Sequence, residues 1–127
     1  PGKRPLSSMS PTIVLRGGKL FMVTGSPGGS TIISPTLESF LTVADFEMNM
    51  QQGVDAPRLH QQWYPDMVFV EPGLLTAKTQ AALEAMGYKF KQVRSFGADE
   101  AILVNPKTHL LEGANDRRRP SGLAAGY

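Results

Sequence analysis

A glycine-rich stretch at residues 24–30 has the composition of a backbone anion site. It reads TGSPGGS and follows the apolar run LFMV at residues 20–23. If a strand ends there and a helix begins beyond the glycines, several backbone N–H groups lie at a helix N-terminus without internal partners. Such groups suit a phosphate, a carboxylate or a transient oxyanion. Gly28 and Gly29 would let a ligand approach closely, although a tight strand-to-helix turn alone also favours glycine.

The glycine stretch lacks the signatures of nucleotide loops. No lysine follows Gly29, as a P-loop would require, and the spacing does not follow G-x-G-x-x-G. The sequence therefore argues against nucleotide binding.

A second stretch, PLSSMSP at residues 5–11, carries hydroxyl groups between two prolines. Ser7 and Ser8 can donate to a ligand carboxylate, or they can satisfy nearby backbone groups. No G-x-S-x-G surrounds either serine. The only histidines are His60 and His109, and nothing supports a Ser-His-Asp triad.

The composition predicts one domain over residues 1–127 and narrows the classes of function. Hydrophobic residues make up 41% and charged residues 19%, with a net charge of +2. That is a globular composition, and the charge does not imply nucleic acid. The absence of cysteine excludes disulfides, thiolate metal sites and a cysteine nucleophile. No apolar run is long enough to span a membrane, and the first residues do not form a signal peptide.

Local patterns predict a mixed α and β chain, of class α+β. A tight hairpin is expected at Gly17-Gly18, and a helix over 31–50 with its apolar face at Ile33, Leu37, Leu41, Ala44 and Met48. Pro35 would lie in the first turn after a Ser34 cap or bend the helix near its start. Further helices are expected at 49–56 and 76–86, with Gly87 ending the latter. The expected strands are 12–15, 20–23, 67–71, 88–93, 100–105 and 109–113, followed by an irregular tail.

Both short stretches belong to a longer series of motifs. RPLSSMSPTIV and VTGSPGGSTII are followed by GVDAPRLHQQW, VEPGL, LEAMGYK, GAND and a terminal AGY. In this order and spacing the set resembles the C-terminal part of the small (β) subunit of the γ-glutamyltransferases (γ-glutamyl transpeptidases). The resemblance covers essentially all of the chain.

The resemblance implies a fold, a reaction and partners. The family's fold is the N-terminal nucleophile hydrolase αββα sandwich, in which two stacked sheets lie between helical layers. A precursor cleaves itself, and the new N-terminal threonine of the small subunit attacks the γ-glutamyl amide with its own α-amine as base. Glutathione is the usual donor, and water or an amino acid or peptide accepts the acyl group. No cofactor is implied.

Residue by residue, the resemblance assigns half of an active site. Gly28 and Gly29 match the glycine pair whose backbone N–H groups form the oxyanion hole. Ser7 and Ser8 match the serine pair that holds the α-carboxylate of the glutamyl group. The catalytic threonine and the groups that hold the α-amine belong to an upstream segment of the small subunit, and an arginine belongs to the large subunit. Because the sequence begins at Pro1, we expect a cut or processed chain that lacks the nucleophile and is inactive alone.

Other candidate residues have structural interpretations. Arg58 and His60 are expected to tie a loop to a sheet beside a packed Trp63, and DRRRP at residues 116–120 is expected to be a solvated turn. The acidic residues show no metal-ligand spacing, and no metal is predicted. The methionines at positions 48, 50 and 86 are expected to fill the core.

Two alternatives and a compartment accompany this interpretation. The chain could belong to a non-catalytic γ-glutamyl or amino-acid-binding homologue, or to a glutaryl (cephalosporin) acylase of the same family. Family members are commonly periplasmic, secreted or outward-facing, so such a compartment is expected by resemblance alone.

Overall fold

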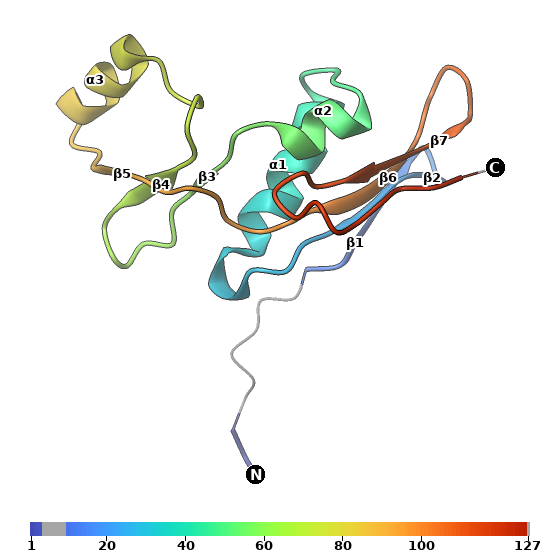
Figure 1. Cartoon of the computed structure of the whole chain (residues 1–127), viewed down its shortest axis with the longest axis horizontal. Coiled ribbons are helices and arrows are strands. Elements are labelled where there is room, and N and C mark those ends of the chain that lie inside the picture. Colours follow the sequence, from blue (N-terminus) through green and yellow to red (C-terminus); the bar gives the residue numbers. More distant parts are fainter. Residues whose placement is uncertain (4–9, 127) are drawn as a thin grey trace. The chain divides into compact units, whose positions relative to one another are not determined.

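The computed structural model describes residues 1–3 and 10–126. Its contacts divide the chain into two compact units. The first unit comprises Pro1–Ala56 and Gly97–Tyr127, and the second is Pro57–Phe96. Each unit is described by itself (Figure 1), and the expectation of one domain over residues 1–127 stays a prediction.

The first unit is built on a four-stranded antiparallel sheet in the order β1-β2-β6-β7. Gly17 and Gly18 join the first two strands with φ angles of 59° and 76°, the conformation that two-residue hairpins require. The predicted hairpin is therefore confirmed, and the last two predicted strands form and pair antiparallel. The strands span Thr12–Arg16, Lys19–Gly25, Glu100–Val104 and Leu111–Asn115.

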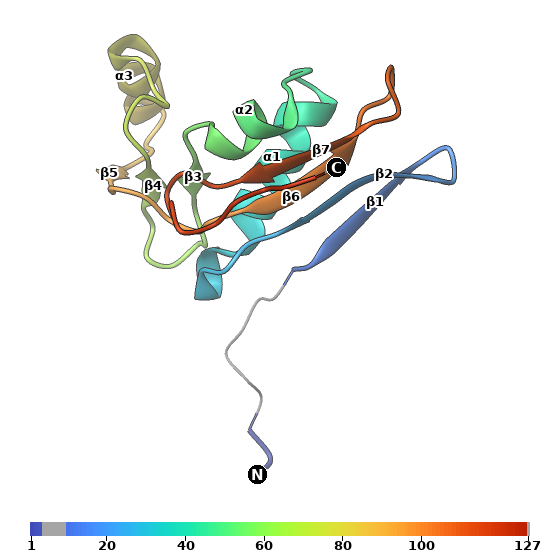
Figure 2. The ribbon, with the colours of Figure 1, turned by 45° about the vertical axis from the view of Figure 1, so that its right-hand side comes forward.

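Two helices cover one face of this sheet (Figure 2). They are α1, Ile33–Ala44, and α2, Met50–Asp55. Side chains alternate along a strand, so alternate residues generally point at the helices. The consecutive residues Phe21 and Met22 are both buried, beside the register shift of β1 on β2 at Val14/Leu15. The core between helices and sheet consists of Phe21, Met22, Val43, Met50, Val54, Ala101, Leu103 and Ala114.

The predicted apolar face of α1 is wrong in part. Ile33 and Leu37 are 55% and 51% exposed, whereas the buried residues of the helix are Pro35, Thr36, Ser39 and Val43. Small and polar residues can face the sheet because they allow close approach. The Thr36 hydroxyl, for example, is satisfied by donating to the Ile32 carbonyl oxygen at 3.0 Å. The face of α1 that is buried depends on the direction in which the chain leaves the glycine loop. The spacing of apolar residues along the sequence does not reveal that direction.

The ends of α1 also differ from expectation. The N-cap is Ile32, which makes no side-chain cap bond, so Ser34 is not the cap; Pro35 lies in the first turn. The helix ends at Ala44, where the chain turns through Glu47 with a positive φ of 55°. Met48 therefore lies outside the helix and is 37% exposed, contrary to its predicted place in the core.

The short helix α2 forms where it is predicted, because local signals define both of its ends. The Asn49 side chain accepts from the Gln52 N–H, and the Gln52 side chain accepts from the Asn49 N–H, a complete capping box. Pro57 follows the C-cap residue Ala56. The cap directs Met50 and Val54 into the core, where both are fully buried.

The second unit is a three-stranded sheet in the order β3-β4-β5 with helix α3. α3 spans Ala77–Ala85 and is capped by the Thr76 hydroxyl, which accepts from the Thr79 N–H. It forms the crossover between β4 and β5, which are parallel. The sequence predicts β4, α3 and β5 but misses β3, which is only two residues long. The strands are Leu59–His60, Val68–Val70 and Phe90–Gln92.

The capping box yields a stability prediction. Asn49→Ala should lower the free energy of unfolding by about 1 kcal/mol, because the exposed Asn49 contributes little beyond its cap bonds. Asn49→Ser keeps an oxygen acceptor and should retain most of that energy. Urea denaturation followed by circular dichroism measures both variants, and equal losses would contradict the capping role.

Candidate functional site

The glycine loop joins β2 to α1 through a short 3-10 helix at Gly29–Thr31. Gly28 has a φ of 150° and Gly29 a φ of 60°, conformations that L-residues rarely adopt. The Gly28 carbonyl oxygen accepts from the Thr31 N–H at 3.1 Å and from the Thr31 hydroxyl at 3.0 Å. The predicted strand, glycine loop and helix are therefore confirmed (Figure 1).

The two glycines have different steric surroundings. A Cβ on Gly28 would lie 2.7 Å from Thr31 Oγ1 and 3.6 Å from the Gly97 Cα. A Cβ on Gly29 would meet nothing within 4 Å. Gly28 is thus required by both conformation and space, whereas conformation alone explains Gly29. The interpretation that a tight strand-to-helix turn requires these glycines is therefore confirmed.

The amide groups of the loop remain available to a ligand. Both glycines are exposed, and no hydrogen bond among residues 1–3 and 10–126 uses the N–H of Gly28 or Gly29. Two adjacent outward N–H groups ahead of a helix favour negative charge. The loop can therefore donate to an anion or to an oxygen that becomes negative during a reaction.

A second segment, residues 97–99, lies against this loop. The Ala98 N–H donates to Ser26 Oγ at 3.0 Å, and Ser26 Oγ donates to the Pro27 carbonyl oxygen at 2.9 Å. A Cβ on Gly97 would lie 2.7 Å from Pro35 Cγ and 2.8 Å from Ser26 Oγ. Only glycine fits there, so close backbone packing holds the two segments together.

Two buried carboxylates extend the contact into the unit. The Thr24 hydroxyl lies 2.8 and 3.0 Å from the two carboxylate oxygens of Asp99. The Asp99 N–H donates to Asp116 Oδ2 at 2.8 Å. Both carboxylates are fully buried, and burial of charge is tolerated only with such partners.

Arg118 joins the same cluster, and the prediction of a solvated turn at residues 116–120 is wrong at this position. Its backbone N–H and Nη1 donate to Asp116 Oδ1 at 2.9 and 3.1 Å. Its guanidinium also donates to the carbonyl oxygens of Val54 and Ala56, at 3.0 and 2.8 Å. These carbonyls lie at the C-terminal end of α2, where a cation is favoured. A run of arginines in the sequence does not reveal which one is anchored.

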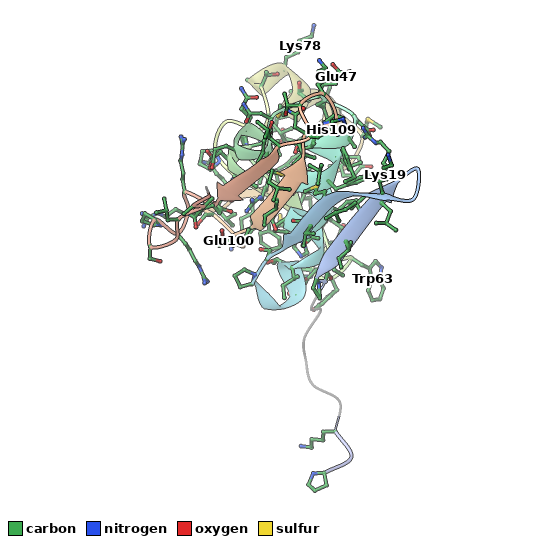
Figure 3. All side chains as sticks on the ribbon, turned by 90° about the vertical axis from the view of Figure 1, so that its right-hand side faces the viewer. Lys19, Glu47, Trp63, Lys78, Glu100 and His109 are labelled. Atoms are coloured by element: carbon green, nitrogen blue, oxygen red, sulfur yellow. The ribbon has the colours of Figure 1, made fainter. Side chains whose placement is uncertain are left out.

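Glu100 stands at the edge of this acidic cluster. It pairs with Gly25 and Asn115 across the sheet, at the opposite end of β2 from Lys19 (Figure 3). Desolvation raises the pKa of its carboxyl, and the charges of Asp116 and Asp99 raise it further. A backbone hydrogen bond from Asp116 lowers it by a smaller amount. The surroundings of Glu100 therefore disfavour the ionised form of its carboxyl group.

Ser7 and Ser8 lie outside the described residues, and their predicted role stays a prediction. The described chain resumes at Ser10, whose carbonyl oxygen accepts from the Thr12 hydroxyl at 2.9 Å. Gly28 and Gly29 are thus the only two of the four predicted site residues whose geometry is described.

Within the second unit, Arg58 and His60 are buried. The backbone N–H groups of Arg58 and Phe96 both donate to the Glu71 carboxylate, at 3.1 and 3.0 Å. Arg58 Nη1 also reaches the Phe96 carbonyl oxygen, at 3.4 Å. His60 lies near the rings of Phe69 and Phe96. These contacts support the interpretation of both residues as ties between loop and sheet.

Two large side chains of this unit are not packed as predicted. Trp63 is 84% exposed (Figure 3) and Met86 is 73% exposed. The backbone of Trp63 has a positive φ of 72°, within an exposed turn. Residues 1–3 and 10–126 contain no group of three or more His, Cys, Asp or Glu side chains that could hold a metal ion. No helix in the same part of the chain is long and apolar enough to cross a membrane.

Comparison with known proteins relates the whole described region to one family. The family model described as gamma-glutamyltranspeptidase matches residues 1–126. The chain is 48% identical over 135 residues to a glutathione hydrolase proenzyme of Pseudomonas sp. strain A14, covering 100% of this chain and 24% of that protein. It is 46% identical over 127 residues to the glutathione hydrolase proenzyme of Escherichia coli K12, covering 100% and 22% respectively.

A solved structure from the same family has a fold similar to that of this chain. A crystallised variant of the Helicobacter pylori γ-glutamyltranspeptidase superposes with a TM-score of 0.86 at 45% identity. The match covers 93% of this chain and 64% of that one. The mixed α and β arrangement predicted from the sequence is thus that of a known N-terminal nucleophile hydrolase. The chain spans about a quarter of the length of the two proenzymes, at 24% and 22%.

The position of Glu100 yields a pH prediction. Because the folded state raises its pKa, the folded protein binds the proton more tightly than the unfolded chain does. Ionisation of Glu100 therefore removes stability as the pH rises through the carboxyl range. Glu100→Gln should stabilise the protein at about pH 7 and gain little at about pH 4. Urea unfolding at both values measures this, and an equal gain at the two would contradict it.

Proposed function

The chain belongs to the γ-glutamyltranspeptidase family, and we propose that it supplies half of the active site of a γ-glutamyl transferase or hydrolase. Its share is the oxyanion hole, from the N–H groups of Gly28 and Gly29, and the carboxylate site, from Ser7 and Ser8. The observation that supports this best is the pair of exposed glycine N–H groups ahead of α1, without partners among the described residues. Glutathione and related γ-glutamyl amides are the proposed donors, in keeping with the names of the two proenzyme relatives.

The glycine pair would act as negative charge develops. A nucleophilic hydroxyl adds to the γ-carbonyl carbon and gives its proton to a base, so that the carbonyl oxygen becomes an oxyanion. Donors aimed at that position stabilise the tetrahedral intermediate more than the substrate. The intermediate then expels the amine, which takes the proton, and leaves an ester on the enzyme. Water or an acceptor amine then attacks this ester and gives a proton to the base, which forms a second tetrahedral oxyanion at the same N–H groups. Its collapse expels the enzyme's nucleophilic oxygen, which takes the proton back from the base, and releases the hydrolysed or transferred γ-glutamyl product.

The nucleophile is proposed to be an N-terminal threonine contributed by another part of the precursor. An α-amine serves as base only when the threonine is terminal. Thr12, Thr24 and Thr31 are internal and cannot act in this way. These 127 residues alone are therefore proposed to be inactive.

The face of the first unit's sheet opposite the core is exposed and apolar. This supports the proposal that the chain functions together with the rest of the precursor. Ile13, Val23 and Ile102 are register neighbours on β1, β2 and β6, on the face opposite the core residues. They are 69%, 37% and 47% exposed. A contiguous apolar face of this kind marks an interface. We propose that the large subunit and the upstream part of the small subunit cover it.

The balance between transfer and hydrolysis depends on the acceptor, and no acceptor site is assigned to these residues. Neutral serine donors suit the α-carboxylate of a glutamyl group and equally the terminal carboxylate of a glutaryl group. The two groups differ only in the α-amine, so groups that hold the α-amine would separate γ-glutamyl donors from the glutaryl side chains of an acylase. An outward-facing compartment is proposed on family grounds alone.

The oxyanion role predicts a selective loss of turnover. In the complete precursor, Gly29→Val should lower kcat by about 10²–10³-fold, because a β-branched residue cannot adopt the φ of 60° and the N–H groups are displaced. Rates of γ-glutamyl-p-nitroanilide hydrolysis, taken per mole of processed enzyme, measure the effect.

Gly17→Val is the matched control. Gly17 has a φ of 59° and, like Gly29, open space around its Cβ position, so the backbone strain is similar. It lies in the β1–β2 hairpin, and kcat should stay within about threefold. If the two variants lose turnover equally, strain alone explains the loss and the glycine pair has no oxyanion role.

The serine pair predicts a defect in substrate binding. Ser7→Ala and Ser8→Ala should each raise the donor KM by about 10- to 100-fold, the value of a hydrogen bond to a charged group, with a smaller change in kcat. Ser10→Ala tests a neighbouring hydroxyl outside the proposed site and should leave KM near wild type. Unchanged KM in both single variants would remove the serines from the site.

A further inference from the structure

We propose that Asp99, through Thr24, is the positioning residue that sets the direction of the oxyanion-hole N–H groups; this inference rests on the proposed function. The set of residues involved is called here the Asp99 network. It consists of Thr24, Ser26, Ala98, Asp99, Asp116 and Arg118, all in the first unit.

The contact between Thr24 and Asp99 lies just before the glycine loop. Thr24 is the penultimate residue of β2, and four residues separate it from Gly29. Its hydroxyl reaches both oxygens of the Asp99 carboxylate, at 2.8 and 3.0 Å. Thr24 is 3% exposed and Asp99 is 0% exposed. A charge-assisted hydrogen bond in a buried setting is short and strongly directional.

The segment that carries Asp99 also supports the loop directly. Asp99 follows Ala98, whose N–H donates to Ser26 Oγ within the loop. The Gly97 Cα would lie 3.6 Å from a Cβ on Gly28. The Asp99 segment therefore bonds to Thr24 at the end of β2 and to Ser26 in the loop, and its Gly97 lies close to Gly28.

Asp99 is itself held from the opposite side. Its N–H donates to Asp116 Oδ2, and Asp116 Oδ1 is held by Arg118, which bonds carbonyl oxygens at the end of α2. Asp116 and Arg118 are 0% and 13% exposed at their side chains. The network thus couples the loop to the C-terminal end of α2, which Arg118 reaches across 64 residues of sequence.

Such a tether matters because the loop has little internal support. Residues 27–30 of the loop are all exposed. Their two glycine N–H groups must meet an oxygen that is charged only in the transition state. Misplacement by about 1 Å can cost about 10²-fold in rate. Ground-state binding of the glutamyl carboxylate, assigned to Ser7 and Ser8, does not depend on these N–H groups.

Thr24→Val in the complete precursor tests this inference. Valine has nearly the shape of threonine and lacks the hydroxyl, so the strand is preserved and the bond to Asp99 is lost. We expect kcat to fall roughly 10- to 100-fold with KM within about threefold. Thr24→Ser restores the hydroxyl and should recover kcat to within about threefold. Thr42→Val is the control, since its hydroxyl bonds only the Ser39 carbonyl oxygen within α1.

A double-variant cycle separates positioning from general destabilisation. Asp99→Ala removes the acceptor oxygens and should lower kcat like Thr24→Val. The two changes together should cost no more than the worse single change, because both break the Thr24–Asp99 contact. Ser26→Ala is a second, milder probe of the same segment, and it too should lower kcat. Melting temperatures and intact masses establish that each enzyme is folded and processed.

The outcomes are distinct from those of the proposed function. If the wild-type precursor does not turn over γ-glutamyl-p-nitroanilide, the proposed function fails. If the wild type is active, Gly29→Val is impaired and Thr24→Val or Ser26→Ala, once processed, keeps full kcat, only the positioning role fails. Additive losses in the double variant, or no rescue by serine, would also overturn it.

Discussion

Burial of the Asp99 and Asp116 carboxylates is the constraint on which the first unit depends. Each fully buried carboxylate needs hydrogen-bond donors, since an uncompensated buried charge is strongly destabilising. The donors come from β2, from the segment before β6 and from the turn after β7. Meeting that need brings the end of β2, where the glycine loop starts, to a fixed place beside residues 97–99. The loop's position is therefore a consequence of electrostatics as much as of packing.

Within that frame, the glycines serve conformation and chemistry together. Gly28 adopts a φ of 150° in a space that a Cβ would overfill, and Gly29 a φ of 60° in open space. Both glycines are exposed, and within the described residues no hydrogen bond uses either N–H. The turn interpretation and the anion-site interpretation of TGSPGGS are thus not alternatives. The turn that requires glycine is also what exposes the donors.

The sequence predicts well those elements whose signals are local. The hairpin at Gly17-Gly18 and the helices at residues 49–56 and 76–86 are predicted from signals that act within a few residues, and all three are confirmed. The misses depend on distant contacts. The buried face of α1 depends on how the glycine loop delivers the chain, and the anchored state of Arg118 depends on carbonyls 62 and 64 residues away. The glycine loop could be located from its motif, and its oxyanion role stays a prediction, whereas the buried Asp99 network leaves no spacing pattern to detect.

The two halves of the proposed site differ in what they require from the fold. A carboxylate site needs donors matched to a charge already present in the substrate, and flexible serines can meet it. An oxyanion hole must be arranged before the charge appears, because reorganisation during the reaction would consume the advantage. In keeping with this requirement, the glycine pair lies next to a buried network of hydrogen bonds within the same unit. The same sheet has an exposed apolar face at Ile13, Val23 and Ile102. This is the face that the rest of the precursor is proposed to cover, and that part of the precursor is also proposed to bring the nucleophile.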